Sequence, residues 1–163
     1  MSAELQYQIE QFLYKKAELC DAQDWDAYLA LFSDDSVLHL PQWDSEHVYT
    51  TDPKKGMSLI YYPNRGGLED RVFRIRTGKA ASATPMPRTL HQISNVRIQP
   101  MEGGYLEARV NWQTLYYRQA TAEHFFGRAT YTLRPNGEGW LISKKHTVLL
   151  NDTINSVLDF YHI

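Results

Sequence analysis

The chain has 163 residues, of which 43% are hydrophobic and 22% charged, and its formal net charge is −2. This length and composition indicate one globular domain spanning residues 1–163, large enough to bury a core without disulfides or structural metals. The absence of a basic excess argues against nucleic acid as a partner. No apolar run predicts a membrane segment or a secretion signal, so we expect a cytoplasmic protein.

Two amphipathic helices are predicted at the start of the chain. The first carries an apolar stripe at helical spacing, formed by Leu5, Ile9, Leu13 and Ala17. Cys20 continues this stripe and is interpreted as a small buried hydrophobe rather than a reactive thiol. Asp24 is the expected N-cap of the second helix, whose apolar stripe extends to Phe32.

Two short strands and a third helix are predicted next. The strands cover residues 36–40 and 57–62, and a polar loop separates them. The helix covers residues 68–77 and ends at Gly78, the residue type that most often adopts the left-handed conformation after a helix. Leu68 and Val72 share its apolar side, whereas Phe73 projects away from that side and is expected to be exposed.

The remainder of the chain is predicted to be an antiparallel meander. Strands are expected at residues 88–99, after a Gly103-Gly104 turn, around 125–133, and at 140–150 after an Asn136-Gly137 turn. Short connections favour antiparallel neighbours. Helices first and strands last predict an α+β fold, in which N-terminal helices pack on a curved, mostly antiparallel sheet that forms a half-open cone. Four large aromatic residues are interpreted as core rather than as a substrate platform: Trp112, Tyr116, Phe125 and Tyr131.

Metal and nucleophile motifs are missing from the sequence. The six histidines form no HxxxH or HExxH pattern, and one cysteine cannot supply the two that a Rieske cluster requires. The nearest approach to an iron-binding set is a polar stretch with His39, Asp44, Glu46 and His47, for which solvated loop charges are the favoured interpretation. We therefore expect no catalytic, cofactor-binding or metal-binding residue in this chain.

The main alternative is a stand-alone isomerase or dehydratase with an acid–base pocket in the cone. Candidate groups are Tyr14, Asp34, Asp35, His39 and His91, one of which would need a shifted pKa in an open apolar pocket. The two aspartates are more typical of a solvated helix end, and His91 of a hydrogen-bonded structural histidine. A binding adaptor similar to nuclear transport factors is a third, weaker alternative.

Arginine is concentrated in one part of the chain. Half of the ten arginines lie between Arg65 and Arg88. Arginine and exposed aromatic residues are typical anchors of protein interfaces. We predict a subunit interface that includes the following residues: Arg65, Asp70, Phe73, Arg74, Arg88, His91 and Tyr161.

Five segments of the chain resemble the small (β) subunits of aromatic-ring-hydroxylating dioxygenases. They are DWDAYLALFSDD (24–35), SLIYYPNRGGLEDRVFRIRTG (58–78), PRTLHQISNVRI (87–98), HFFGRATYTL (124–133) and KKHTVLLNDTINSVLDFYHI (144–163). The resemblance covers nearly the whole chain. Residues 61–71, YYPNRGGLEDR, are most similar to the benzoate and anthranilate branch, and anthranilate is the expected substrate.

The resemblance implies a cystatin-like cone, the fold of SnoaL-like and nuclear-transport-factor-like proteins. It implies a hexamer of three α and three β subunits, with the Rieske [2Fe–2S] cluster and mononuclear Fe(II) in the α subunit. The α subunit would convert anthranilate to catechol with O2 and electrons from NADH, delivered by a separate reductase. The β subunit would be mainly structural.

Overall fold

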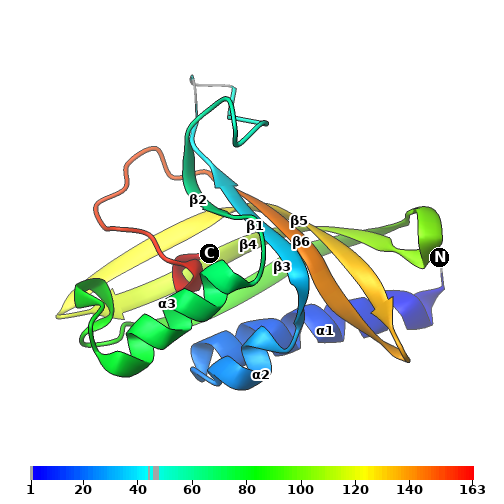
Figure 1. Cartoon of the computed structure of the whole chain (residues 1–163), viewed down its shortest axis with the longest axis horizontal. Coiled ribbons are helices and arrows are strands. Elements are labelled where there is room, and N and C mark those ends of the chain that lie inside the picture. The colour runs from blue at the N-terminus through cyan, green and yellow to red at the C-terminus, as the bar shows by residue number, and fades with distance from the viewer. Residues whose placement is uncertain (1, 44, 46–47) are drawn as a thin grey trace.

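The computed structural model describes residues 2–43, 45 and 48–163. Three helices lie on one side of a twisted sheet (Figure 1): α1 (Ala3–Asp21), α2 (Trp25–Leu29) and α3 (Gly66–Thr77). The strands are β1 (Phe32–Pro41), β2 (Ser58–Tyr62), β3 (Arg88–Pro100), β4 (Leu106–Arg118), β5 (Thr121–Asn136) and β6 (Gly139–Leu149). Short 3-10 helices cover Ala81–Ala83, Glu102–Gly104 and Phe160–His162.

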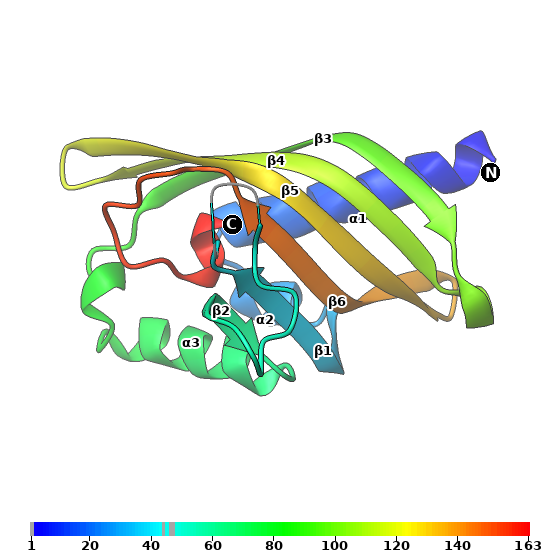
Figure 2. The same cartoon turned by 90° about the horizontal axis from the view of Figure 1, so that it is seen from above.

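The six strands form one sheet in the order β2-β1-β6-β5-β4-β3. The predicted meander from β3 to β6 is confirmed, because each of these strands pairs antiparallel with the next. Strands β1 and β6 pair in parallel, a pairing that was not predicted. The long strands curve around α1, as the view from above shows (Figure 2). The predicted α+β cone is therefore confirmed.

Two element boundaries differ from the prediction. Strand β1 begins at Phe32, four residues before the predicted start, so Phe32 is not part of the second helix. The backbone N–H of Ile142 in β6 already donates to the carbonyl of Leu31 at 2.8 Å, and this pairing ends the helical region after Leu29. From Leu31 onward, the backbone therefore pairs with β6 instead of continuing the helix.

Helix α1 covers the edge of the sheet that β3 forms. Strand β3 is an edge strand, and its unpaired backbone groups need partners. The Asp21 carboxylate accepts from the backbone N–H of His91 at 3.0 Å and from the hydroxyl of Thr89 at 2.9 Å. At the other end of α1, the Gln6 amide donates to the carbonyl of Val96 at 2.9 Å. These bonds fix the helix along β3.

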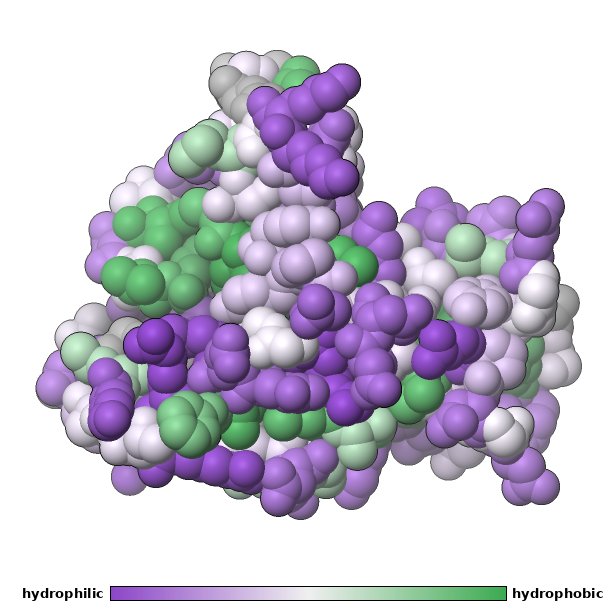
Figure 3. Space-filling model, in the orientation of Figure 1, coloured by the Kyte–Doolittle hydropathy of each residue, from purple (hydrophilic) through white to green (hydrophobic). Residues whose placement is uncertain are grey.

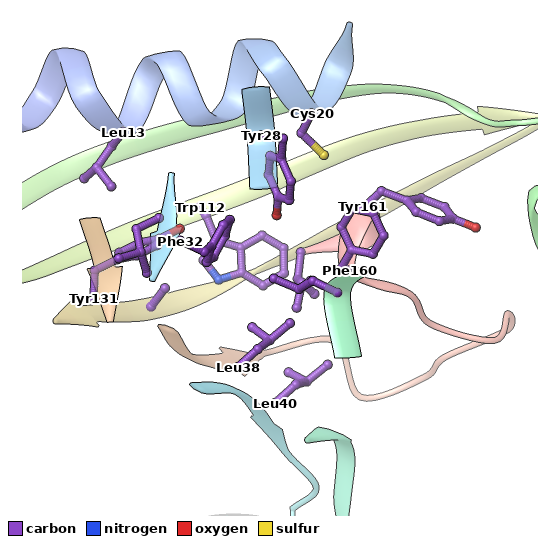
Figure 4. Close-up of a cluster of buried hydrophobic side chains, with 14 of the residues drawn as sticks. Leu13, Cys20, Tyr28, Phe32, Leu38, Leu40, Trp112, Tyr131, Phe160 and Tyr161 are labelled. Carbon is purple, nitrogen blue, oxygen red and sulfur yellow. The ribbon is translucent and has the colours of Figure 1, made fainter. Parts of the chain in front are cut away.

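The core lies between the sheet, α1, α2 and the C-terminal residues (Figure 4). Phe160 is 1% exposed, and its ring centroid lies 5.3 Å from that of Trp25 and 5.6 Å from that of Tyr28. Cys20 is 3% exposed, and burial raises its pKa to about 12, so its prediction as a buried hydrophobe is confirmed. The four aromatic residues predicted to be core are also buried: Trp112, Tyr116, Phe125 and Tyr131.

Candidate subunit interface

Three arginines of the predicted cluster hold α3 onto the rest of the chain. Arg65 binds the Asp34 carboxylate at 2.7 Å and donates to the carbonyl of Phe32 at 3.0 Å, which connects the start of α3 to β1. Arg71 donates through Nε to the Asp159 carboxylate at 2.9 Å and so connects the middle of the helix to the C-terminal segment. Arg65 and Arg71 thereby stabilise the fold of the single chain.

Arg76 makes the third of these connections. Its Nη2 atom lies 2.8 Å from Oδ1 of Asp26 in α2. Both side chains are largely exposed, so the pair contributes little stability on its own, although it joins two helices.

Other residues of the cluster face solvent. Phe73 is 67% exposed, and Asp70 and Arg74 lie beside it on the same helix. In the part of the chain that the structure describes, the guanidinium groups of Arg74 and Arg88 have no side-chain partner. These four residues are therefore available for contact with another molecule.

Two residues of the predicted interface are instead buried within the chain. Tyr161 is 1% exposed, and its ring stacks on that of His162 with centroids 4.9 Å apart. The His91 side chain is 7% exposed, and its Nδ1 atom hydrogen-bonds Asp21. In the isolated chain, neither side chain offers much surface to a partner.

Of the groups proposed for acid–base catalysis, Tyr14 and His91 line the same open groove, and Asp34, Asp35 and His39 lie outside it. The Asp34 and Asp35 side chains are 91% and 74% exposed and pair with Arg65 and Arg134. His39 is 3% exposed, and its Nε2 atom lies 2.9 Å from the Ser58 hydroxyl. Burial lowers the pKa of His39 below its ordinary value.

His91 faces a cavity that is too small for a substrate. Burial lowers its pKa despite the hydrogen bond to Asp21. The cavity that it lines with Lys16, Trp112 and Lys145 measures about 10 Å³, the volume of one water molecule. An open groove of about 1050 Å³ also passes His91, but the buried Nε2 atom is not exposed to it.

The metal alternative has little support from the described residues. Among them, no group of three or more His, Cys, Asp or Glu side chains is arranged to hold a metal ion. His39 is near His146, with ring centroids 5.3 Å apart. Asp44, Glu46 and His47 lie outside the described residues.

Exposed apolar residues on the outer face of the sheet were not predicted from the sequence. Leu90, Leu115, Tyr117 and Phe126 are 59%, 42%, 50% and 41% exposed. Leu90 lies opposite Leu115 across β3 and β4. The signal was present in the sequence, because Leu115 and Tyr117 occupy positions of β4 that alternate with the buried Trp112, Thr114 and Tyr116.

A second apolar region lies on the opposite side of the cone. Figure 3 shows hydrophobic surface beside the C-terminal segment. In that segment Ile154 and Val157 are 37% and 77% exposed. Exposed apolar patches of this kind often mark protein contacts.

Among the described residues, no helix has the length and apolar character needed to cross a bilayer.

Comparison with known proteins agrees with this geometry. The ring hydroxylating beta subunit family matches residues 15–156. The chain is 60% identical, over 100% of both sequences, to the anthranilate 1,2-dioxygenase small subunit of Acinetobacter baylyi. The benzoate 1,2-dioxygenase beta subunit of Burkholderia mallei superposes with a TM-score of 0.79 at 41% identity, over 95% of each chain.

A more distant structure supports the fold. An NTF2-like protein with a cystatin-like fold from Novosphingobium aromaticivorans has a TM-score of 0.62 at 16% identity, over 95% of this chain and 89% of that one. The predicted cystatin-like cone is thereby confirmed. Because the family match covers most of the chain and a relative is 60% identical over its full length, this chain belongs to the ring-hydroxylating dioxygenase beta-subunit family.

Proposed function

We propose that this chain is the small subunit of the oxygenase component of an anthranilate 1,2-dioxygenase. The observation that carries the proposal is the 60% identity, over the full length, to a subunit of that enzyme. The benzoate enzyme's subunit, by comparison, is 41% identical. The difference favours anthranilate over benzoate as the substrate of the complete enzyme.

The proposed role of the chain is structural. It assembles with a catalytic α subunit and with further copies of itself, as a cytoplasmic hexamer of three α and three β subunits. The α subunit holds the Rieske [2Fe–2S] cluster and the mononuclear Fe(II), and a reductase supplies electrons from NADH. The filled core supports this role, because the cavity of about 10 Å³ beside His91 cannot admit an aromatic acid.

The exposed face of α3 supports contact with another subunit. Phe73, Arg74 and Asp70 lie on one exposed part of the helix, and Arg65, Arg71 and Arg76 hold that helix in place. Arg88 lies at the start of β3. A rigid helix with an exposed aromatic residue and a free arginine is typical of a protein contact.

Co-expression with a Rieske-containing α subunit tests the proposal. We expect one complex of equal stoichiometry by size-exclusion chromatography with light scattering. With the reductase and NADH, this complex should convert anthranilate to catechol faster than it converts benzoate. A small chain that stays separate from the α subunit would contradict the structural role, and a preference for benzoate would contradict the substrate.

A further inference from the structure

Three arginines are close together on the outer face of the sheet, far from the α3 cluster in sequence. Arg97, Arg109 and Arg128 lie on β3, β4 and β5, and all three are exposed. Arg97 is directly opposite Arg109, and Arg128, which pairs with Asn111, is the diagonal neighbour of Arg109. They line a groove of about 630 Å³, which we call the arginine groove.

No carboxylate lines the arginine groove, in contrast to Arg65, Arg71 and Arg76, which each pair with a carboxylate. Like charges directly opposite each other on adjacent strands destabilise a sheet. In the described residues, the one carboxylate near the three guanidinium groups is that of Glu107, 3.4 Å from Arg109, and no acidic residue lines the groove. The fold itself therefore gains little from these charges, and an external anionic group would offset their repulsion.

The surroundings of the groove indicate a protein rather than a small anion. Phe126, which is exposed, lies two residues from Arg128 on the same face of β5, and Leu90, Leu115 and Tyr117 are exposed toward the other end of the same three strands. Arginine and aromatic side chains together are enriched at protein interfaces. Adjacent strands are about 4.8 Å apart, so three strands spread the guanidinium groups over about 10 Å, wider than one carboxylate.

A second copy of this chain fits the groove poorly. A symmetric contact would place the same surface on both partners. Six guanidinium groups would then face one another without carboxylates. Charge complementarity requires a different chain that presents acidic residues.

We propose that the outer face of β3, β4 and β5 docks an acidic segment of the large oxygenase subunit. Arg97, Arg109 and Arg128 bind at least two of its carboxylates, and the neighbouring apolar residues pack against its apolar side chains. Arg88 lies at the start of β3, nine residues before Arg97, so this strand takes part in both proposed contact regions. The inference rests on the proposed function, because it names the site at which the large subunit binds.

Charge reversal tests the docking surface. In a double variant that combines Arg97→Glu with Arg128→Glu, we expect the affinity for the large subunit to fall at least about a hundredfold. Like charges would then replace complementary ones at the contact. Binding of the unmodified chain should weaken as salt increases, and the variant should show a smaller salt dependence. Arg97→Lys combined with Arg128→Lys keeps the charges and should retain most of the affinity. Lys15→Glu combined with Lys54→Glu, two exposed positions outside this face of the sheet, makes the same change in net charge and is the control.

A readout on the free chain separates docking from folding. Arg97→Glu places a carboxylate opposite Arg109, so the melting temperature of the isolated chain should stay the same or rise while docking weakens. A lower melting temperature that accounts for the weaker docking would overturn the proposal.

The remaining outcomes of the charge-reversal experiment separate a failure of the docking surface from a failure of the proposed function. If the reversed variant binds the large subunit as tightly as the unmodified chain does, the docking surface is wrong and the proposed function stands. If reversal abolishes only contacts between small subunits, the groove serves self-assembly and the inference is again wrong. An unmodified chain that binds no large subunit would instead refute the proposed function itself.

Discussion

A pair of lysines lies in the core, which is unusual for charged residues. Lys16 and Lys145 are each 3% exposed, and their ammonium nitrogens lie 5.5 and 5.7 Å from the ring centroid of Tyr131. Burial, together with the adjacent charge of Lys16, lowers the pKa of Lys145 well below its ordinary value. Among the described residues, no carboxylate forms an ion pair with either amine.

Lys145→Met should leave stability unchanged or raise it. Methionine fills a similar volume, and the substitution removes a buried amine that has no ion-pair partner, so we expect a gain of between zero and about 1 kcal/mol in the free energy of unfolding. Urea denaturation measures the effect, with the exposed Lys144→Met as the control. A loss of more than about 2 kcal/mol would show that the Lys145 charge is paired in the native state.

Phe73→Ala should affect assembly more than folding. Because Phe73 is 67% exposed, its truncation should change the free energy of unfolding by less than about 0.5 kcal/mol. The neighbouring Val72→Ala removes a side chain that is 2% exposed and should cost about 2 kcal/mol. Thermal melts of the free chain and co-purification with the α subunit distinguish the two. Reduced stability with intact assembly for Phe73→Ala would place Phe73 in the core.

At the level of single residues, local spacing predicted orientation but not partners. The burial of Leu68 and Val72 and the exposure of Phe73 follow from helical periodicity and are confirmed. The partner of Arg71 is 88 residues away, and nothing local indicates that pairing. Tyr161 follows no periodic element, so its burial was not visible in the sequence. The sequence therefore located the arginines without separating those that stabilise the fold from those that remain free.

Helix α3 is attached to the C-terminal segment through one partly buried ion pair. The Asp159 side chain is 3% exposed and accepts from Arg71 and from the backbone N–H of Phe160. Arg71→Met would leave the carboxylate buried without its counterion, and we expect a loss of about 3 kcal/mol. Chemical denaturation measures the loss, and hydrogen exchange at residues 159–163 should increase.

Two variants control for this effect. Arg74→Met removes an arginine from the exposed side of the same helix and should change stability little. Adding Asp159→Asn to Arg71→Met removes the unpaired charge and should recover part of the loss. Equal effects of Arg71→Met and Arg74→Met would contradict an essential role for the ion pair.

Gly127 sets the distance between β5 and β6. A Cβ atom at this position would lie 1.8 Å from the carbonyl oxygen of Val148, so the strands would have to separate. Gly127→Ala should therefore cost about 3 kcal/mol, measured as a fall in denaturation midpoint. Gly139→Ala, whose nearest contact is at 3.7 Å, is the matched control and should be nearly neutral. A stable Gly127→Ala variant would mean that the sheet tolerates this separation.

Elements were predictable where glycine or periodicity marked them. Gly78, Gly103, Gly104 and Gly137 all have positive φ, as their predicted turn and capping positions require. The β4–β5 turn uses Gln119 and Ala120, with φ of 50° and 62°, and therefore carried no such signal. The parallel pairing of β1 with β6 joins segments far apart in sequence, and local patterns cannot specify it.

The whole molecule should lose stability in acid because burial lowers the pKa of four of its histidines. Burial lowers the pKa of His162 to about 4 and lowers the pKa of His39, His91 and His146 below 6.5. Between these values the unfolded chain binds more protons than the folded one, so stability falls as the pH decreases from 6.5 to 4. His162 alone should contribute on the order of 3 kcal/mol to this loss.

His162→Asn tests this prediction. The amide oxygen can accept from the backbone N–H of Asp159, as Nδ1 of His162 does at 2.8 Å, but asparagine does not titrate. Denaturation midpoints between pH 7 and 4 should show lower stability at neutral pH, because ring stacking is lost, and a shallower decline in acid. The exposed His124→Asn should keep the original slope. An unchanged slope for His162→Asn would contradict the assignment.

For the molecule as a whole, the sequence predicted the architecture but not whether the cone is filled. Helical and strand periodicity, with the order of the elements, is enough for the α+β class. The volume beside His91 depends on how Lys16, Trp112 and Lys145 pack together, and these residues come from three different elements. Only the structure shows that this space is too small for an aromatic acid.

The position of the last residues has a consequence for the order of folding. Phe160, Tyr161 and Ile163 are 1%, 1% and 3% exposed in the same core as Trp25 and Tyr28. During synthesis, α1, α2 and β1 emerge first, yet β6 and these final side chains complete their packing. Contacts between distant parts of a chain form slowly, and the incomplete core exposes apolar surface meanwhile. Until β6 and the segment that carries Phe160 have been synthesised, the apolar side chains of α1 and α2 therefore lack part of their packing partners.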